Sequence, residues 1–376
     1  MNKDIIVIGG YGHVGSQICT LLSEHYPGHV YAAGRSLERA EQFCKATGSK
    51  VKPLRLDLTE KADPRLLKRA KLVVMCMDQQ DTAFAEACLQ NGVYYVDVSA
   101  NGAFLARLEA LASSSRPFAG TAVLSVGLAP GLTNMLARHA SEAMDHTDCA
   151  DITIMLGLGD RHGKAAIEWT IDNLRADFDI MEKGSLVAAT SFTSGKISDL
   201  GEGLGRRTAY RFPFSDQQTL PRTLGIASVS TRLCFDSRIA TGSVALMQKF
   251  GLKKMLHSQR MRKAAVWSFS KLRYGSDQYA IKVDACGTKN GLPYVAEYGI
   301  QGRNEARITA RTAAAVAGAI YSATLPPGIF HIEELFTLEL ASDHLSLRLA
   351  DTTKSDQSFT IDEIRCWTRE LFQQHK

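Results

Sequence analysis

Apolar runs and helical periodicities alternate along the first third of the chain. Short apolar runs predict buried strands at residues 5–8, 29–34, 51–58, 71–77, 93–98 and 121–126. Helical patterns fill most of the intervals, at residues 16–24, 37–46, 64–69, 82–91 and 102–113. Strands that alternate with helices of this length predict an α/β fold with a parallel, doubly wound sheet.

A glycine-rich turn joins the first predicted strand to the first helix. Gly10, Gly12 and Gly15 have the spacing G-x-G-x-x-G, with His13 and Val14 inside it. Gly10 permits a tight turn, Gly12 lets a pyrophosphate approach the backbone, and Gly15 lets the helix pack closely on the strand. The N–H groups and dipole at the helix start favour negative charge. We therefore predict a Rossmann dinucleotide-binding domain, with a glycine-rich turn that binds no ligand as the alternative.

The end of the second predicted strand indicates which nicotinamide cofactor binds. An NAD site usually has an acid here, about twenty residues after the glycines, for the ribose 2′-hydroxyl. This chain has Gly34, Arg35 and Ser36 instead, without a carboxylate. A guanidinium and a hydroxyl suit a 2′-phosphate, so we expect NADP, with NAD as the alternative cofactor. The alternative is that neither residue binds a cofactor: Arg35 is solvated and Ser36 only caps the next helix.

Polar and sulfur-containing side chains follow the next three strands, at the edge where ligands of such sheets bind. Asp57 is a candidate acceptor for the adenine amino group, or a turn carboxylate. Cys76 and Met77 would lie along the cofactor, although such side chains more often serve packing. Asp97 and Ser99 end the fifth strand, where the nicotinamide half is expected. Asp97 is a candidate proton-transfer group, with a capping aspartate as the alternative.

Several of these segments together resemble the saccharopine dehydrogenase/reductase-like family. They are the glycine turn, Ala-Gly-Arg-Ser at 33–36, Tyr-Val-Asp at 95–97 and Pro-Gly-Leu-Thr-Asn at 130–134. The resemblance is strongest over residues 1 to about 140. It continues more weakly through residues 160–164, 212–216 and 309–323.

The resemblance implies a two-domain architecture and a reaction class. Residues 1–128 would form the NAD(P)-binding Rossmann domain, and residues 129–324 an α/β domain with a mixed sheet, for substrate and dimerisation. The segment from about 325 to 376 would return to the first domain. Characterised members make or break a C–N bond of an amino acid, by hydride transfer through an imine. The implied activity is that of an NADP-dependent oxidoreductase acting on CH–NH groups.

Proton transfer and carboxylate binding require further side chains. His162, in the charged turn 159–163, is the first candidate for general acid or base, because histidine titrates near neutral pH, and Asp97 is the second. A surface or capping histidine is the structural alternative. Guanidinium groups bind carboxylates bidentately, so the substrate-binding candidates among the arginines are Arg206, Arg207, Arg211 and Arg232, each with surface solvation as the alternative. Asn134, in the first turn of a helix after the proline–glycine pair, joins these candidates.

Two other functions compete with the implied one. Gly9, Gly12 and Gly15 also fit the G-x-x-G-x-x-G spacing of short-chain dehydrogenases, which act on CH–OH groups. That class needs a tyrosine four residues before a lysine, and none of the eleven tyrosines has one. A non-enzymatic NADP sensor or partner-binding protein would use the same nucleotide domain, and the fold alone does not distinguish it.

Composition bounds the partners and the compartment. The 376 residues are 45% hydrophobic, and the net charge of +5 is spread without blocks, which is not a nucleic-acid signature. Eight cysteines without a C-x-x-C pair predict reduced thiols and no metal site. The apolar runs are too short to span a bilayer, and we expect no signal peptide before the first strand. A basic helical stretch at 244–272 is typical of a solvated face. We expect a cytoplasmic protein that forms a homodimer and acts on a small molecule, an amino acid, amine or keto acid, with no nucleic acid or membrane partner.

Overall fold

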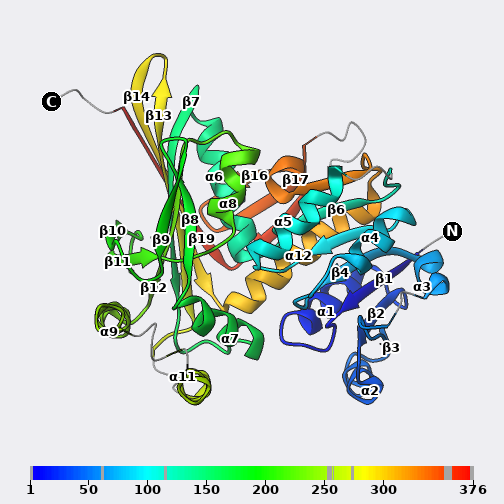
Figure 1. Ribbon diagram of the computed structural model, residues 1–376. Helices are drawn as coiled ribbons and strands as arrows, with labels where there is room; N and C mark the ends of the chain where they lie inside the picture. The colour runs from blue at the N-terminus through cyan, green and yellow to red at the C-terminus, as the bar shows by residue number, and fades with distance from the viewer. Residues whose placement is uncertain are drawn as a thin grey trace. The chain divides into compact units, whose positions relative to one another are not determined.

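The chain divides into two compact units in the computed structural model, which describes residues 3–60, 63–113, 117–251, 256, 258–271, 275–350 and 358–372 (Figure 1). The first unit comprises Met1–Leu132, Arg307–Thr337 and Ser346–Ile361. The second comprises Thr133–Ala306, Leu338–Leu345 and Asp362–Lys376. Both units are therefore built from separate stretches of the chain.

The first unit contains a parallel sheet whose described strands number seven, in the order β15-β6-β5-β4-β1-β2-β3. This is the doubly wound Rossmann order with one added edge strand, which confirms the predicted α/β fold class. Ile5, Ile6 and Val7 are fully buried, because their strand lies in the middle of a sheet with both faces covered. The strands are β1 (Asp4–Ile8), β2 (Val30–Gly34), β3 (Val51–Arg55), β4 (Ala70–Met75), β5 (Tyr94–Asp97), β6 (Thr121–Leu124) and β15 (Gly328–His331).

Helices connect these strands as the sequence predicts. The short elements are η1 (Leu111–Ser113), η2 (Leu128–Leu132) and α13 (Ile332–Leu335). The helices are α1 (Gly15–His25), α2 (Leu37–Ala46), α3 (Pro64–Arg69), α4 (Ala83–Gln90), α5 (Gly102–Ala110) and α12 (Glu305–Ser322). Ala310, Ala313 and Ala317 of α12 are fully buried, which a small side chain permits at a close helix contact. From Arg307 onward α12 groups with the first unit, whereas the sequence analysis placed it in the second domain.

The second unit contains a sheet of nine described strands that run in mixed directions. β7 and β12 pair in parallel and the other pairs are antiparallel, so the predicted mixed sheet is confirmed. Asn290 and Gly291 join β13 to β14 with positive φ angles of 55° and 74°, as the hairpin turn requires. The strands are β7 (His146–Leu156), β8 (Asp177–Glu182), β9 (Ser185–Thr190), β10 (Lys196–Asp199), β11 (Arg206–Arg211), β12 (Ser228–Phe235), β13 (Gln278–Lys289), β14 (Leu292–Arg303) and β19 (Ile364–Phe372).

Helices cover one face of this mixed sheet. α6 (Thr133–Glu142) packs on β7, β13 and β14, while α8 (Asp216–Thr223) packs on β8 and β12 (Figure 1). Ile152 and Ile154 of β7 are fully buried, whereas Asp151, directly before Ile152, lines a cavity. Because alternate residues of a strand point to opposite faces, the two faces of the sheet differ: one is apolar and covered, and the other carries charge.

Two segments differ from the sequence-based expectation. The basic stretch 244–272 forms two helices, α9 (Arg238–Lys249) and α11 (Gln259–Lys271), because Gly251 with φ of 95° ends the first; residues 252–255, 257 and 272 of the expected helix lie outside the described residues. The sequence pattern of the tail 332–372 predicts one or two helices, and among its described residues only α13, of four residues, is helical. Apart from α13, the described tail forms β19 and a further sheet of β16 (Phe336–Leu340), β17 (His344–Leu349) and β18 (Phe359–Asp362).

The remaining helix of the second unit is α7 (Lys164–Asn173). Across the residues that the structure describes, no helix combines the length and the apolar character needed to cross a membrane.

Candidate functional site

The turn between β1 and α1 has room only for glycine at its key positions. A Cβ added to Gly10 would lie 2.6 Å from the carbonyl oxygen of Val7. One added to Gly12 or to Gly15 would lie 2.9 or 2.3 Å from the carbonyl oxygen of Gly9. These neighbours are backbone atoms, which cannot move aside as a side chain can. The three glycines are therefore required by the turn itself.

The same turn offers unpaired backbone donors. Gly12 donates its N–H to Gly9 at 2.8 Å, which closes the turn. In the part of the chain that the structure describes, the N–H groups of His13, Val14 and Gly15 have no acceptor, and no side chain caps α1 at Val14. Donors grouped at a helix start form a cradle for an anion such as a pyrophosphate. The turn thus fits the group that the sequence predicts there.

Basic and aromatic side chains gather at the end of β2. Arg35 is exposed, whereas Ser36 donates its N–H to the Tyr11 hydroxyl at 3.0 Å and caps α2 by accepting from the N–H of Arg39 at 3.3 Å. Gly34 is in contact with Tyr11, since an added Cβ would lie 2.4 Å from its hydroxyl oxygen. The guanidinium of Arg39 lies 5.0 Å from the centre of the Tyr11 ring. Arg39, one helical turn after Arg35, is a second cation at this edge that the sequence analysis missed.

The candidates after β3 and β4 are held by local contacts. Asp57 accepts from the backbone N–H and the hydroxyl of Thr59 at 3.0 and 2.9 Å, and these hydrogen bonds lower the pKa of its carboxyl, with Arg35 adding to the effect. Desolvation raises the pKa of the Cys76 thiol, so it stays protonated near neutral pH. Met77 packs on the glycine turn, where a Cβ at Gly9 would lie 2.8 Å from its side chain.

Asp97 is a fully buried carboxyl at the end of β5. One of its oxygens accepts from the Tyr95 hydroxyl at 2.7 Å and from the Gln79 side-chain amide at 3.3 Å, and the other accepts from the N–H of Ser99 at 2.7 Å. Burial raises the pKa of Asp97 from the ordinary 3.8 to about 6, although these hydrogen bonds lower it. The side chain therefore caps the turn at Ser99 and also titrates close to neutral pH.

Gln79 is a polar residue of this edge that the sequence analysis missed. Its amide group also donates to the Tyr95 hydroxyl at 2.6 Å, which fixes the amide orientation. Its carbonyl oxygen Oε1 is buried and has no hydrogen-bond partner among the described residues. A buried acceptor without a donor is costly, so Oε1 is suited to accept from a bound ligand. Its position two residues beyond Met77 was the available signal.

His162, in the second unit, has both ring nitrogens engaged. Nε2 lies 2.9 Å from the carbonyl oxygen of Gly157, and Nδ1 lies 3.0 Å from a carboxylate oxygen of Glu305. Burial lowers the pKa of His162, but the hydrogen bond and charge of Glu305, with Gly157 and Asp160, raise it from 6.5 to about 9. Because both neighbours are acceptors, the ring is held as a doubly donating imidazolium.

We expect the substitution Glu305→Gln to destabilise the protein most at acidic and neutral pH. The pKa of His162 is raised in the folded state, so its stabilising effect is complete below pH 6.5 and disappears as the pH rises through about 9. The shift corresponds to roughly 3 kcal/mol. Urea unfolding at a series of pH values measures it. Asp148→Asn, which removes the acid of the exposed His146–Asp148 pair, is the matched control and should change little. An identical pH dependence in Glu305→Gln and the unsubstituted protein would contradict this.

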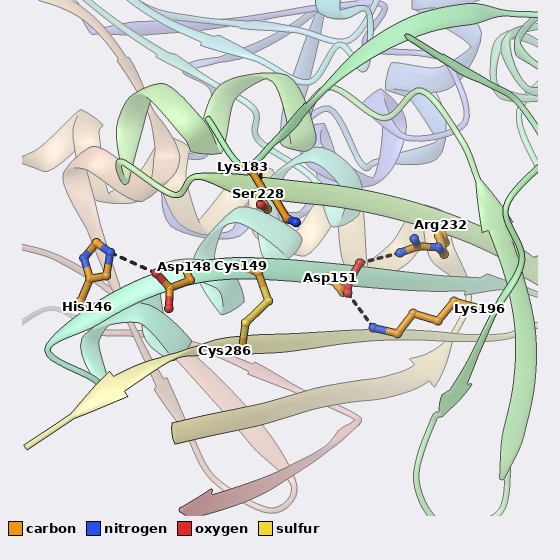
Figure 2. Close-up of a disulfide and its surroundings, with 9 residues drawn as sticks. All are labelled: His146, Asp148, Cys149, Asp151, Lys183, Lys196, Ser228, Arg232 and Cys286. Carbon is orange, nitrogen blue, oxygen red and sulfur yellow. Dashed lines mark hydrogen bonds and ion pairs between the residues drawn. A yellow bond between two sulfur atoms is a disulfide. The ribbon is translucent and has the colours of Figure 1, made fainter. Parts of the chain in front are cut away.

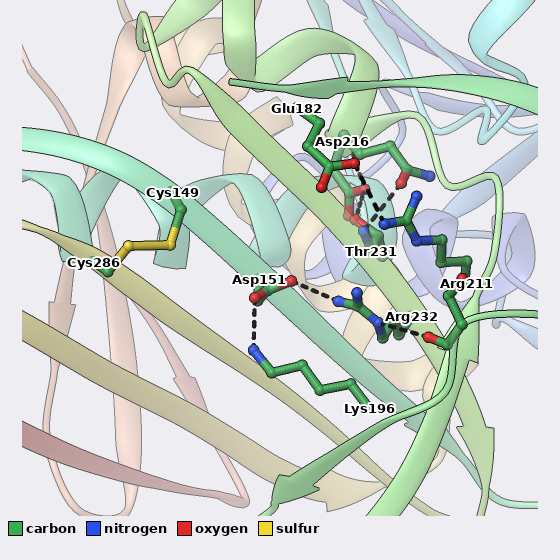
Figure 3. Close-up of polar contacts among 11 residues, drawn as sticks. Cys149, Asp151, Glu182, Lys196, Arg211, Asp216, Thr231, Arg232 and Cys286 are labelled. Carbon is green, nitrogen blue, oxygen red and sulfur yellow. Dashed lines mark hydrogen bonds and ion pairs between the residues drawn. A yellow bond between two sulfur atoms is a disulfide. The ribbon is translucent and has the colours of Figure 1, made fainter. Parts of the chain in front are cut away.

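The substrate-binding candidates of the second unit are mostly bound to protein groups. Arg232 lies 2.5 Å from Asp151, whose other oxygen lies 2.6 Å from Lys196 (Figure 3). Arg207 donates to the carbonyl oxygens of Leu204 and Asp236 at 3.1 and 3.0 Å.

Among the other substrate-binding candidates, Arg211 and Asn134 contact protein groups, whereas Arg206 is exposed. Arg211 lies 3.8 Å from Glu182 (Figure 3), and Asn134 is fully buried with its amide on the hydroxyl of Thr219 at 3.2 Å. Arg206 is exposed and lines a cavity of about 540 Å³ on the charged sheet face. The structure brings Arg206 together with Asp151 and Lys196 there, and leaves Arg207 outside that lining.

Acids and bases in this cavity neutralise one another. Lys282 is nearly buried, with its ammonium 2.6 Å from Asp284 and 3.1 Å from Glu297. Burial raises the pKa of Asp284, against the lowering effect of Lys282. With Asp151 bound to Lys196 as well, the cavity lining is a set of ion pairs rather than a field of one sign.

A disulfide at the cavity corrects the expectation of reduced thiols. Cys149 and Cys286 are bonded, with their Cα atoms 5.1 Å apart, and Figure 2 shows the bond crossing from β7 to β13. The two cysteines are direct partners in the antiparallel register, which places their side chains next to each other. The two cysteines are separated by 137 residues, so their spacing in the sequence could not predict the disulfide. The other six cysteines are free.

Comparison with known proteins identifies the first unit. Residues 5–125 match the family model described as the saccharopine dehydrogenase NADP binding domain. Residues 5–125 of the first unit are therefore similar to that domain. The match confirms the family resemblance and the predicted cofactor, NADP, and it places the cofactor domain in an oxidoreductase family. A search of curated protein sequences finds no match for the chain.

Solved structures resemble the chain over most of its length at low identity. Apo saccharopine dehydrogenase (L-Glu forming) from Saccharomyces cerevisiae is 14% identical, with a TM-score of 0.60 over 88% of this chain and 94% of that one. That likeness shows the fold. DAP dehydrogenase from C. glutamicum in complex with DAP and an engineered D-amino acid dehydrogenase bound to NADP⁺ are 13% and 12% identical, each with a TM-score of 0.42 over 89% of this chain and 94% of the other.

Proposed function

We propose that this protein is an NADP-dependent oxidoreductase that transfers hydride at a C–N bond of an amino-acid-type substrate through an imine. The observation that carries the proposal is Asp97, a buried carboxyl with a pKa of about 6 at the ligand-binding edge of an NADP-binding domain. NADP supplies the hydride acceptor or donor when bound. The second unit is proposed to hold the substrate, and the assembly is proposed to be a cytoplasmic homodimer.

Different residues of the first unit would bind different parts of the cofactor. The N–H groups of His13, Val14 and Gly15 would bind the pyrophosphate. Arg35, with Arg39 as a second cation, would bind the 2′-phosphate.

Further along the same edge, other groups would hold the two ring systems. Asp57 would accept from the adenine amino group, while Cys76 and Met77 would lie along the cofactor at the end of β4. Gln79 would use its unpaired Oε1 to accept a hydrogen bond from the carboxamide N–H of the nicotinamide. This hydrogen bond would offset the free-energy cost of burying that oxygen.

Asp97 is the proposed proton-transfer residue. When hydride leaves the α-carbon of an amine, the nitrogen must also lose a proton, and a base within reach takes it. Above pH 6 the Asp97 carboxylate is ionised and can accept that proton, and in the reverse direction the carboxyl returns it. The Tyr95 hydroxyl and the Ser99 N–H hold the carboxylate in one orientation.

His162 and Arg206 are proposed for the substrate side. With a pKa of about 9, His162 is a cation at neutral pH, so it would act as an acid or attract a substrate carboxylate rather than accept a proton. Arg206 is retained as a carboxylate partner because its side chain is exposed. Arg207 and Arg232 are bound to protein acceptors and Asn134 is buried, so these three have less freedom to bind a substrate.

Calorimetric titration with NADPH and, separately, NADH tests the cofactor half of the proposal. We expect tighter binding of NADPH and expect Arg35→Ala to weaken it about 10- to 100-fold, because a charge-assisted hydrogen bond is lost, while NADH binding changes little. Arg55→Ala, which removes an exposed arginine paired with Glu60, is the matched control. An equal loss of affinity for NADPH and NADH would contradict the proposed role of Arg35 in binding the 2′-phosphate.

Turnover tests the chemical half. Mixtures of an α-keto acid with an amino acid or amine are screened for loss of NADPH absorbance, and oxidation that requires both partners supports C–N bond chemistry. Oxidation by a simple ketone without an amine would support a CH–OH dehydrogenase instead. NADPH binding with no turnover of any mixture would favour the NADP sensor.

A further inference from the structure

Helix α9 turns its apolar residues to the solvent. Ile239, Leu246, Met247 and Phe250 are exposed to 82%, 56%, 43% and 82%. Their spacing places them on one side of the helix, with the exposed small residues 242 and 243 between them. Thr241 and Ala245 are the buried residues of this helix. A surface helix normally shows the opposite distribution, so its outer face is suited to an apolar partner.

Helix α11 adds an aromatic residue and cations. Trp267 is 64% exposed, and Arg260 and Lys263 are exposed near it on the sequence. The opposite side of α11 is anchored in the second unit, where Arg262 forms two hydrogen bonds of 2.6 Å with Asp172 of α7. The bidentate ion pair between Arg262 and Asp172 therefore holds α11 in the orientation that exposes Trp267.

The charge of this segment is of one sign. Between Asp236 and Asp277 the sequence has nine lysines and arginines and not a single aspartate or glutamate. The rest of the chain holds the other 35 of the 44 basic residues and all 39 acidic residues, and is net negative. The excess positive charge of the protein is thus concentrated in the segment that holds α9 and α11.

Exposed apolar side chains together with positive charge indicate which kind of partner this segment binds. Two copies of the segment facing each other would bring like charges together. Nucleic acid would use the cations but would leave the aliphatic face of α9 in water. A surface of anionic lipid satisfies both features, since cations attract the headgroups, apolar side chains enter the acyl boundary and tryptophan prefers the interface.

We propose that α9 and α11 form a docking surface for an anionic lipid membrane. Ile239, Leu246 and Phe250 lie at the headgroup–acyl boundary, and Arg260 and Lys263 contact lipid phosphates. The protein lies on such a membrane and does not span it. This replaces the expectation that the basic stretch is only a solvated face, because that expectation did not foresee which side of α9 is exposed.

Sedimentation of the full chain with vesicles tests the proposal. One set of vesicles is phosphatidylcholine alone and the other contains one part phosphatidylglycerol to two parts phosphatidylcholine. We expect binding to the anionic vesicles that weakens with added salt, and at least a tenfold weaker partition for the double variant Ile239→Ser with Phe250→Ser. The matched control replaces Leu186 and Leu292, exposed on β9 and β14, by serine and should bind as the unsubstituted protein does.

Each contrary result overturns the proposal. Absence of binding to anionic vesicles would do so, as would equal binding to both vesicle types or an equal loss in the control variant. If the Ile239–Phe250 double variant instead converts a dimer to a monomer in light scattering, the surface is an interface between copies. If short DNA competes away the vesicles and the double variant binds DNA normally, the cations serve nucleic acid.

Discussion

Gly15→Ala is expected to abolish measurable NADPH binding and to lower the free energy of unfolding by about 3 kcal/mol. The added Cβ would lie 2.3 Å from the carbonyl oxygen of Gly9 and 3.0 Å from the Cα of Gly10. Both are backbone atoms of the turn, so α1 must move away from β1 to admit the methyl group. That movement separates the N–H donors of His13 and Val14 from the turn that positions them.

Calorimetric titration with NADPH and urea unfolding measure the two effects. Gly242→Ala is a suitable control because a Cβ at this position in α9 meets nothing within 4 Å, and alanine favours a helix interior over glycine by roughly 1 kcal/mol. The control should bind NADPH normally and be as stable as the unsubstituted protein or more so. Normal NADPH binding by Gly15→Ala would show that the close approach at this turn is not what admits the nucleotide.

Most of the first unit could be predicted from sequence because its signals are local. Each buried strand is a continuous apolar run and each helix has its own periodicity, so the order of elements specifies the doubly wound sheet. β15 could not be found in this way, since residues 328–331 pair with β6 some two hundred residues away. The tail was misread because its strands, such as β17, alternate over too few residues to exclude a helical pattern.

The site shows the same division between local and distant information. The glycine turn and Arg35 are read from adjacent residues, so they were found. Gln79 stands two residues beyond Met77 in the sequence, but its role becomes clear from its hydrogen bonds to Tyr95 and Asp97 on the neighbouring strand. The Cys149–Cys286 disulfide likewise depends on the register of two strands. For His162 the sequence supplied the residue but not Glu305, and this partner changes its charge at neutral pH.

Asp97→Asn is expected to remove a pH dependence of stability that the unsubstituted protein has. The pKa of Asp97 is raised in the fold from 3.8 to about 6, so the neutral carboxyl is favoured by folding. Its contribution to stability is complete below pH 3.8 and is lost as the pH rises through about 6. The loss amounts to roughly 3 kcal/mol between pH 4 and pH 7. Asparagine does not ionise, so its unfolding free energy should lack this decline.

The same substitution should lower turnover about 10²- to 10⁴-fold, since a proton acceptor is removed, while NADPH affinity stays close to normal. Asp81→Asn is the control, because Asp81 also accepts a backbone N–H, that of Ala83 at 3.0 Å, but is exposed. It should leave both turnover and the pH dependence of unfolding unchanged. Urea unfolding from pH 4 to pH 8 needs no substrate, so the pKa of Asp97 can be tested before the substrate is identified. If Asp97→Asn loses the decline in stability but keeps full turnover, the carboxyl is titrating where the structure places it and the proton moves through another group.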